Sequence, residues 1–230
     1  MAVTWASPGT LFLKWEMDEP LSARAKVVYA NYLDGLGFPE NAVEHMDRAI
    51  AMRPDALGLH LNKLELICRT GIEGDLLQLF ESAKKAKVFD FGVTNQVERL
   101  IGLAGDQGYF ECKSGTQPFT VVDLFEIAEN ARAREWNAKR AARFFSLKSD
   151  YYASVGNLDS AVTAVEAAAI YQPSVDLFLK ASVMLASAGL YDDALERLAK
   201  AREADEGRRM FYPSRIDELN GLEYAIKALM

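Results

Sequence analysis

The chain has 230 residues, of which 50% are hydrophobic and 26% are charged. This is the composition of a globular protein with room for one large domain or two small ones, and it argues against a largely disordered chain. The 26 basic and 33 acidic residues leave a net charge of −7, which argues against general nucleic-acid binding because such proteins need a positive surface.

The opening segment, residues 1–20, predicts one short helix after Ser7-Pro8, over Leu11–Met17. It has no basic stretch followed by a long apolar run, so no signal peptide is predicted. The longest uncharged runs, 1–13 and 181–191, are shorter than the ~20 apolar residues of a membrane-spanning helix. Two interpretations stay open: the chain is cytoplasmic, or it is part of a longer exported or membrane protein.

Three segments share one spacing of glycine, alanine and a bulky residue. Each has an alanine five residues after a glycine, a second alanine seven residues later, and a bulky side chain between the two alanines. A glycine can adopt positive φ and end a helix, while a small alanine lets two helices approach closely. The three sets are Gly37, Ala42, Met46 and Ala49; Gly156, Ala161, Val165 and Ala168; and Gly189, Ala194, Leu198 and Ala201.

This pattern resembles the tetratricopeptide repeat (TPR), a helix–turn–helix unit of about 34 residues. The spacing from Gly37 to Gly71 is 34 residues. The resemblance implies an all-α fold, a right-handed superhelix of about twelve antiparallel helices whose concave face is lined by the first helix of each pair. An irregular helical bundle is the alternative.

We expect a single TPR-like domain over 1–230, with a divergent middle and a C-terminal capping helix. Its second repeat has Leu76 where the small alanine belongs. Further helices are predicted over Thr94–Gly105, Thr120–Ala131, Ala133–Ser154 and Ile216–Leu229, with no strand and a long loop over 105–119. The expected parts are an opening helix at 1–20, an N-terminal pair at 22–87, divergent helices at 88–144, a C-terminal pair at 145–204 and the cap at 213–230.

Cys68 and Cys112 are the only cysteines. They are too few and too far apart for a structural zinc site made of cysteines. Either they are two reduced thiols or they form a disulfide, since Cys112 lies in a loop long enough to reach the end of a nearby helix.

Nothing in the sequence matches a catalytic motif, and we predict no catalytic residue, cofactor or metal. His45 and His60 lie in different repeats, and the carboxylates are spread along helix surfaces. A soluble helical enzyme is therefore the least favoured class, and binding of a protein or peptide partner is favoured instead.

The TPR resemblance places one set of residues on the groove side of the first two repeats: Arg24, Asn31, Asn62, Glu65 and Arg69. TPRs that clamp a C-terminal carboxylate use two lysines, two asparagines and a further base. Asn31 and Asn62 occupy the two asparagine positions, but Val27 replaces the first lysine. Chance is the alternative for this partial match.

A basic strip stands out in the acidic chain. Its members follow i, i+3, i+4 spacing and so lie on one helix face. The strip predicts binding of a phosphate, an anionic glycan, a lipid headgroup or an acidic partner, and the alternative is a solvated face. It comprises Arg132, Trp136, Lys139, Arg140 and Arg143.

The N-terminal part carries a second resemblance, to bacterial multi-spanning membrane proteins of glycan polymerase, oligosaccharide ligase or O-mannosyl-transferase type. In these, a Trp-containing segment and a Pro-x-Ser-x-Arg-Ala step lead into C-terminal TPRs, as Trp15 and residues 20–25 do here. The resemblance implies a non-catalytic periplasmic scaffold domain of a membrane protein. The alternative is a free-standing cytoplasmic adaptor for secretion, pilus or envelope assembly.

Overall fold

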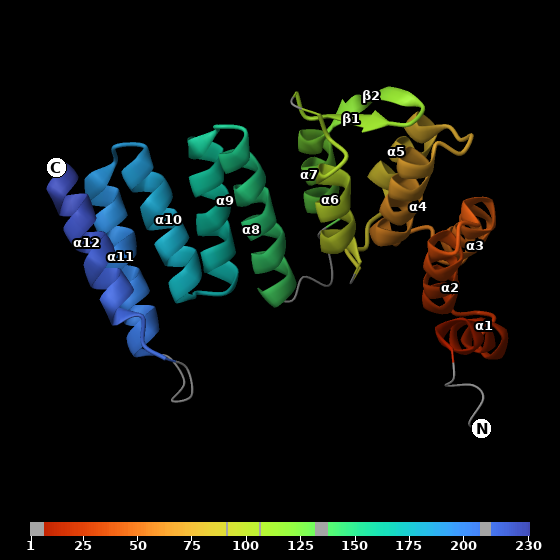
Figure 1. Cartoon of the computed structure of the whole chain (residues 1–230), viewed down its shortest axis with the longest axis horizontal. Coiled ribbons are helices and arrows are strands. Elements are labelled where there is room, and N and C mark those ends of the chain that lie inside the picture. Colours follow the sequence, from red (N-terminus) through yellow and green to blue (C-terminus); the bar gives the residue numbers. More distant parts are fainter. Residues whose placement is uncertain (1–6, 91, 106, 132–137, 208–212) are drawn as a thin grey trace. The chain divides into compact units, whose positions relative to one another are not determined.

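The computed structural model describes residues 7–90, 92–105, 107–131, 138–207 and 213–230. Within these residues the chain forms twelve helices and one two-stranded sheet (Figure 1). Helices make up 73% of this part, so the predicted all-α, TPR-like fold of about twelve helices is confirmed. The chain divides into two compact units, Met1–Glu135 and Trp136–Met230.

The first unit contains seven helices and the sheet. Two helix pairs, α2–α3 and α4–α5, follow the opening helix, and the hairpin β1–β2 lies between α6 and α7. The elements are α1 (Pro8–Asp18), α2 (Ala23–Gly35), α3 (Pro39–Met52), α4 (Leu57–Thr70), α5 (Leu76–Lys85), α6 (Val93–Ile101), β1 (Tyr109–Cys112), β2 (Gly115–Thr120) and α7 (Val121–Asn130).

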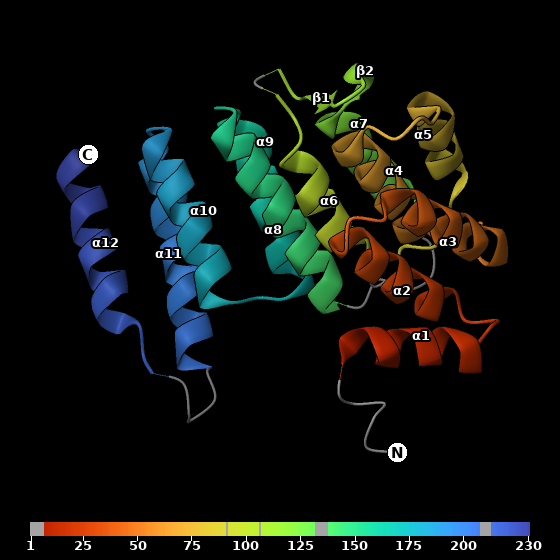
Figure 2. The ribbon, with the colours of Figure 1, turned by 45° about the vertical axis from the view of Figure 1, so that its right-hand side comes forward.

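The second unit contains five helices that lie side by side in both views (Figures 1 and 2). Two pairs, α8–α9 and α10–α11, are followed by a final helix. The elements are α8 (Ala138–Ser154), α9 (Leu158–Tyr171), α10 (Val175–Ser187), α11 (Tyr191–Glu206) and α12 (Ile216–Leu229).

Three of the four pairs share one tight turn. Gly37, Gly156 and Gly189 have φ of 84°, 77° and 77°, and each is followed two residues later by the first residue of the next helix. The residue after each glycine donates its N–H to a carbonyl five positions back, as Phe38 does to Leu33 at 3.0 Å. This pair of features is a Schellman cap, which ends one helix and lets the chain reverse.

The second pair turns differently. Gly71 also has positive φ, 77°, but its own N–H bonds to the Ile67 carbonyl at 2.9 Å, and four further residues precede α5. Leu76, which stands in the alanine position of the repeat, is instead the first residue of α5, and Asp75 caps it. The leucine found at the alanine position of the repeat therefore marks a longer turn between α4 and α5.

Small and bulky residues of the repeat pattern fill the contacts between paired helices. Ala42, Ala161 and Ala194 are all 0% exposed, as predicted. In the second unit, the Ser182 hydroxyl on α10 donates to the Ala194 carbonyl on α11 at 2.8 Å, which joins the two helices. The repeat spacing thus predicts the core positions.

The segment expected to be a loop contains a β-hairpin, so the prediction of no sheet is wrong. Strands β1 and β2 pair antiparallel, with Cys112 opposite Gly115 at the turn. Phe110 is 0% exposed and Phe119 is 3% exposed, and the Phe119 ring stacks on Phe80 of α5 at 4.1 Å between centroids. Burial of these two rings holds the hairpin as a sheet on α5 and gives it a core that an isolated hairpin lacks.

Both end helices begin close to where the sequence predicts. Ser7 caps α1 by accepting the Thr10 N–H at 3.2 Å, and α1 packs beside α2 (Figure 2). Helix α12 starts at Ile216, where buried Asp205 of α11 accepts the Arg215 N–H at 3.2 Å and the Ser214 hydroxyl at 2.6 Å. In the part of the chain that the structure describes, no helix has the length and apolarity to cross a membrane.

Candidate binding surfaces

The predicted groove residues do not form one open surface. On α2, Arg24 and Asn31 are exposed. On α4, Asn62 is 4% exposed and Glu65 is 6% exposed, because α6 and the hairpin pack on this helix in addition to α3 and α5. The carboxylate clamp that the sequence suggested would need an accessible Asn62, and here little of that side chain can be reached.

Arg69, the last predicted groove residue, joins the two helix pairs of the first unit. Its guanidinium Nε donates to Glu65 Oε1 at 2.8 Å, and its Nη2 donates to Asp34 Oδ2 on α2 at 2.6 Å. Burial opposes its charge, but the hydrogen bonds and charges of Glu65 and Asp34 outweigh that effect and raise the pKa of Arg69. The guanidinium is paired with these two carboxylates, while the side chain is 43% exposed, so its role in binding a partner stays a prediction.

A second polar cluster joins α1, α2 and α3. Lys26 is 6% exposed, and its Nζ donates to Glu16 Oε1 at 2.9 Å; this hydrogen bond lowers the pKa of Glu16. His45 Nδ1 lies 3.7 Å from the same oxygen, and the Tyr29 ring meets the imidazole edge-on. Burial lowers the pKa of His45. These contacts hold α1 against α2 and α3, and the positive charge of Lys26 balances the negative charge of Glu16.

The basic strip is described only in part. Arg132 and Trp136 lie outside the described residues. Lys139 and Arg143 are exposed on α8, and Arg140 is half-buried. Both Arg140 and Arg143 already interact with other residues, so they are not free cations. The anion-binding role of the strip stays a prediction.

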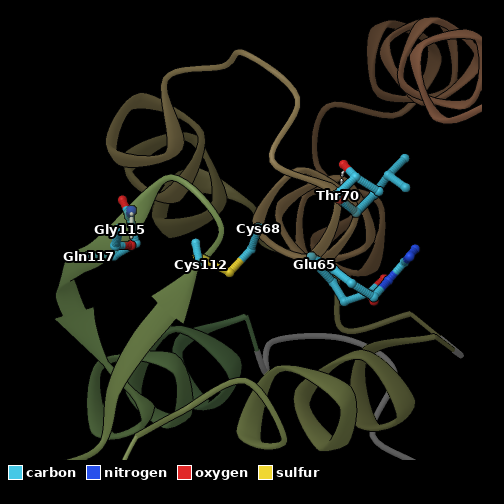
Figure 3. Close-up of a disulfide and its surroundings, with 8 residues drawn as sticks. Glu65, Cys68, Thr70, Cys112, Gly115 and Gln117 are labelled. Atoms are coloured by element: carbon cyan, nitrogen blue, oxygen red, sulfur yellow. Dashed lines mark hydrogen bonds and ion pairs between the residues drawn. A yellow bond between two sulfur atoms is a disulfide. The ribbon is translucent and has the colours of Figure 1, made fainter.

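The two cysteines form a disulfide, with Cα atoms 4.4 Å apart (Figure 3). Cys68 is on α4, Cys112 ends β1, and both are buried. The Lys113 N–H also donates to the Cys68 carbonyl at 3.0 Å, so a backbone bond accompanies the covalent one. Of the two alternatives that the sequence left open, the structure has the bridged one, and it fastens the hairpin to α4.

A cleft of about 380 Å³ opens between α3, α4 and α5. Sequence reasoning missed it, because its lining comes from three helices and no short motif contains it. Apolar side chains line part of it: Val43, Ile50, Ile67 and Leu79. Polar and charged side chains line the rest: Asp47, His60, Lys63, Glu73, Asp75, Gln78 and Ser82.

The second unit has its own cleft of about 300 Å³, between α9, α10 and α11. Its floor is apolar, and Ile170 at its edge is 81% exposed. Arg197 at the rim donates from Nε to Glu166 Oε1 at 2.7 Å, so this rim is internally paired. Neither cleft belongs to the predicted groove.

The histidines and acidic side chains were candidates for metal binding or catalysis. Within residues 7–90, 92–105, 107–131, 138–207 and 213–230, no group of three His, Cys, Asp or Glu side chains is arranged to hold a metal ion. His45 and His60 lie in separate environments, the first beside Glu16 and the second beside the Pro54 carbonyl. The prediction of no catalytic site stays a prediction.

The solved structures to which this chain is similar include TPR proteins. No family model and no curated protein matches the chain. Among solved structures, YrrB, described as a TPR protein with an unusual peptide-binding site, is 17% identical, with 94% of this chain and 97% of that chain covered and a TM-score of 0.40. The thermophilic TPR protein TTC0263 of Thermus thermophilus is 16% identical over 95% of this chain and 88% of that chain, with a TM-score of 0.38.

The chain is also similar to PilW, described as a widely conserved type IV pilus biogenesis factor. It is 16% identical over 84% of this chain and 82% of that chain, with a TM-score of 0.42. At these identities and TM-scores the likeness assigns no role to this chain. The partner of this chain has to be argued from its own residues.

Proposed function

We propose that this chain is a non-catalytic scaffold that binds a protein or peptide partner in an oxidising compartment, the bacterial periplasm. The observation that carries the proposal is the Cys68–Cys112 disulfide, which joins α4 of a TPR-like helix pair to strand β1. Disulfides form and persist outside the reducing cytoplasm, and helical repeats build extended binding surfaces. The disulfide therefore favours the exported alternative over the cytoplasmic adaptor.

The finer setting, a periplasmic domain of a membrane protein in cell-surface glycan synthesis or protein glycosylation, rests on the sequence resemblance around Trp15 and residues 20–25. An anionic glycan or a lipid headgroup at the basic strip would fit that setting. The disulfide is compatible with this periplasmic setting. A partner identified by cross-linking would decide whether the chain works in glycan synthesis or protein glycosylation.

The compartment is tested by blocking free thiols with N-ethylmaleimide when cells are harvested, then digesting the chain without reductant for mass spectrometry. We expect one linked peptide pair that contains Cys68 and Cys112. A copy of the chain retained in the cytoplasm is the control and should carry two alkylated thiols. Alkylation of both cysteines in the natural setting would contradict the proposal.

Partner binding is tested with a photo-cross-linking amino acid placed at Asn31 or at Ile170, both exposed, and at exposed Ala225 as the control. We expect a discrete cross-linked protein from at least one of the first two positions and none from Ala225. The identity of the cross-linked protein then shows whether the partner belongs to a glycan-handling membrane assembly or to a pilus or secretion assembly. The same cross-links at all three positions, or none at any, would contradict a scaffold role.

A further inference from the structure

The cleft between α3, α4 and α5 carries an excess of negative charge. Three carboxylates, Asp47, Glu73 and Asp75, face one ammonium, Lys63, which leaves two negative charges. Lys63 is paired with Asp47. Asp75 caps α5 by accepting the Gln78 N–H at 2.8 Å, so part of its hydrogen-bonding capacity is used.

Glu73 differs from the other two carboxylates. It is exposed, it lines the cleft, and it has no hydrogen-bond or ion-pair partner in the described part of the chain. A carboxylate at the edge of a partly apolar cleft attracts a cation more strongly than one in open water, because the local dielectric constant is lower.

His60 provides a second and independent observation. The residue is 4% exposed, it lines the cleft, and its Nε2 lies 2.9 Å from the Pro54 carbonyl oxygen. A carbonyl oxygen only accepts, so Nε2 must carry the hydrogen, and in the neutral ring Nδ1 is then an acceptor. Nδ1 is buried and has no hydrogen-bond partner. Buried acceptors of this kind are usually satisfied, so an N–H donor is missing here.

The rest of the lining is apolar and comes from Val43, Ile50, Ile67 and Leu79. A volume of about 380 Å³ is within the range of ligand pockets, roughly 300–1,000 Å³. Lysine and arginine side chains combine an apolar stem with a cationic group that donates several hydrogen bonds. The stem suits the four aliphatic side chains, and the cationic group suits Glu73, Asp75 and the acceptor on His60.

We infer that the cleft between α3, α4 and α5 binds a lysine or arginine side chain of a partner peptide. The inference rests on the proposed scaffold function and names the chemistry of one of its sites. None of the predicted groove residues lines this cleft, although α4 contributes residues to both sets.

The test is an NMR titration of the isotope-labelled full chain with three capped peptides that carry two lysines, two arginines or two glutamates between glycines. We expect the two basic peptides to shift the backbone amides around Glu73 and Leu79. They should also shift the non-protonated ring nitrogen of His60, because a donor reaches that atom. The glutamate peptide should shift neither, and raising the salt concentration should weaken the binding.

Two matched variants separate local recognition from the overall charge. Glu73→Gln removes the unpaired carboxylate of the cleft, and Glu40→Gln removes an exposed carboxylate of α3 that does not line it. We expect Glu73→Gln to weaken the basic peptides at least five-fold and Glu40→Gln to change their affinity less than two-fold. Adding Asp75→Asn to Glu73→Gln should weaken binding of the basic peptides further. The helix should be retained, because asparagine can still cap α5.

Equal losses in the two single variants, or shifts that leave the His60 ring and the Glu73 amide unchanged, would overturn the inference. So would equal binding of the glutamate peptide. The scaffold proposal fails by a different result: no cross-linked partner from Asn31 or Ile170. If a partner is cross-linked and Glu73→Gln leaves the yield unchanged, the scaffold proposal stands and the site assignment is wrong.

Discussion

Arg69 on α4 and Asp34 on α2 lie 2.6 Å apart between Nη2 and Oδ2, and this contact ties the first helix pair to the second. The same guanidinium satisfies Glu65, whose side chain is 8% exposed. Arg69, a predicted groove residue, therefore also connects two helix pairs of the first unit. That role leads to the first prediction.

Replacing Arg69 by methionine keeps an apolar stem but leaves the Glu65 carboxylate buried without a partner. We expect the free energy of unfolding to fall by about 1–3 kcal/mol, the usual cost of such a group. Urea denaturation measures this change. The control is Arg48→Met, which removes an exposed pair with Glu44 on α3 and should cost less than about 1 kcal/mol. Equal losses in both variants would show that the Arg69 bridge adds nothing.

Breaking the disulfide should destabilise the first unit. Cys68 and Cys112 are separated by 44 positions, and a crosslink over a loop of that length contributes about 2–4 kcal/mol by restricting the unfolded chain. We expect the urea midpoint to fall when a phosphine reductant is added. The double variant Cys68→Ala, Cys112→Ala should start at the lower midpoint and not respond to reductant. A wild-type midpoint that reductant leaves unchanged would contradict the prediction.

The contact between α8 and α9 has no room for a larger side chain at Ala161, which is 0% exposed. We expect Ala161→Leu to cost about 1–3 kcal/mol of unfolding free energy through overpacking. The control, Ala225→Leu, places the same side chain on an exposed position of α12 and should be close to neutral. Thermal and urea unfolding should rank the two variants in this order; the reverse order would refute the TPR-like role of Ala161.

His45 should make stability fall in mild acid. Burial lowers its pKa in the folded chain below the ordinary value of 6.5, so the unfolded chain takes up the proton first. The stabilisation that depends on neutral His45 is complete above pH 6.5 and is lost as pH falls from there toward the folded-state pKa. Glu16, whose pKa is also lowered, adds a further loss below its ordinary value of 4.5.

The measurement is the free energy of unfolding between pH 8 and pH 4 for the wild type and for His45→Gln. We expect the wild type to lose stability below about pH 6.5, with a slope of up to about 1.4 kcal/mol per pH unit for one proton, and the variant to lose less in that interval. Parallel curves for the two proteins would mean that His45 does not carry the effect.

The part of the basic strip that lies on α8 is tested by charge reversal. If it contacts an anion, Arg140→Glu with Arg143→Glu should weaken binding to anionic lipid vesicles or to heparin several-fold, and the loss should shrink as salt rises because exposed charges are screened over about 8 Å. The control is Arg48→Glu with Arg53→Glu, two exposed arginines of the first unit. Unchanged binding in the strip variant would leave the strip as a solvated face.

The helix pairs could be predicted because their determinants are local. A glycine with positive φ and an alanine five residues later impose the same turn and contact at Gly37, Gly156 and Gly189, wherever they occur in the chain. The hairpin was not predicted, because residues 105–119 were expected to form a loop. Strand β1 has only four residues, Tyr109–Cys112, and a run this short gives little strand periodicity in the sequence.

The candidate site could not be predicted in the same way. Whether Asn62 is accessible depends on α6 and the hairpin packing on α4, and neither contact is encoded near Asn62. The cleft combines Val43, His60 and Glu73 from three separate segments. The unpaired state of His60 Nδ1 is likewise visible only once the Pro54 carbonyl has been placed.

The disulfide also limits how far the first unit can lengthen under mechanical tension. An extended chain spans roughly 3.4 Å per residue, so a bridge across 44 positions removes roughly 150 Å from the length that the unfolded chain can reach. A pulling force applied to the two ends would pass through the sulfur–sulfur bond between α4 and β1, leaving α5, α6 and the segments between them outside the path of the force. A chain held at both ends would then transmit load from α4 through the disulfide into β2 and α7, while α5 and α6 stay unloaded.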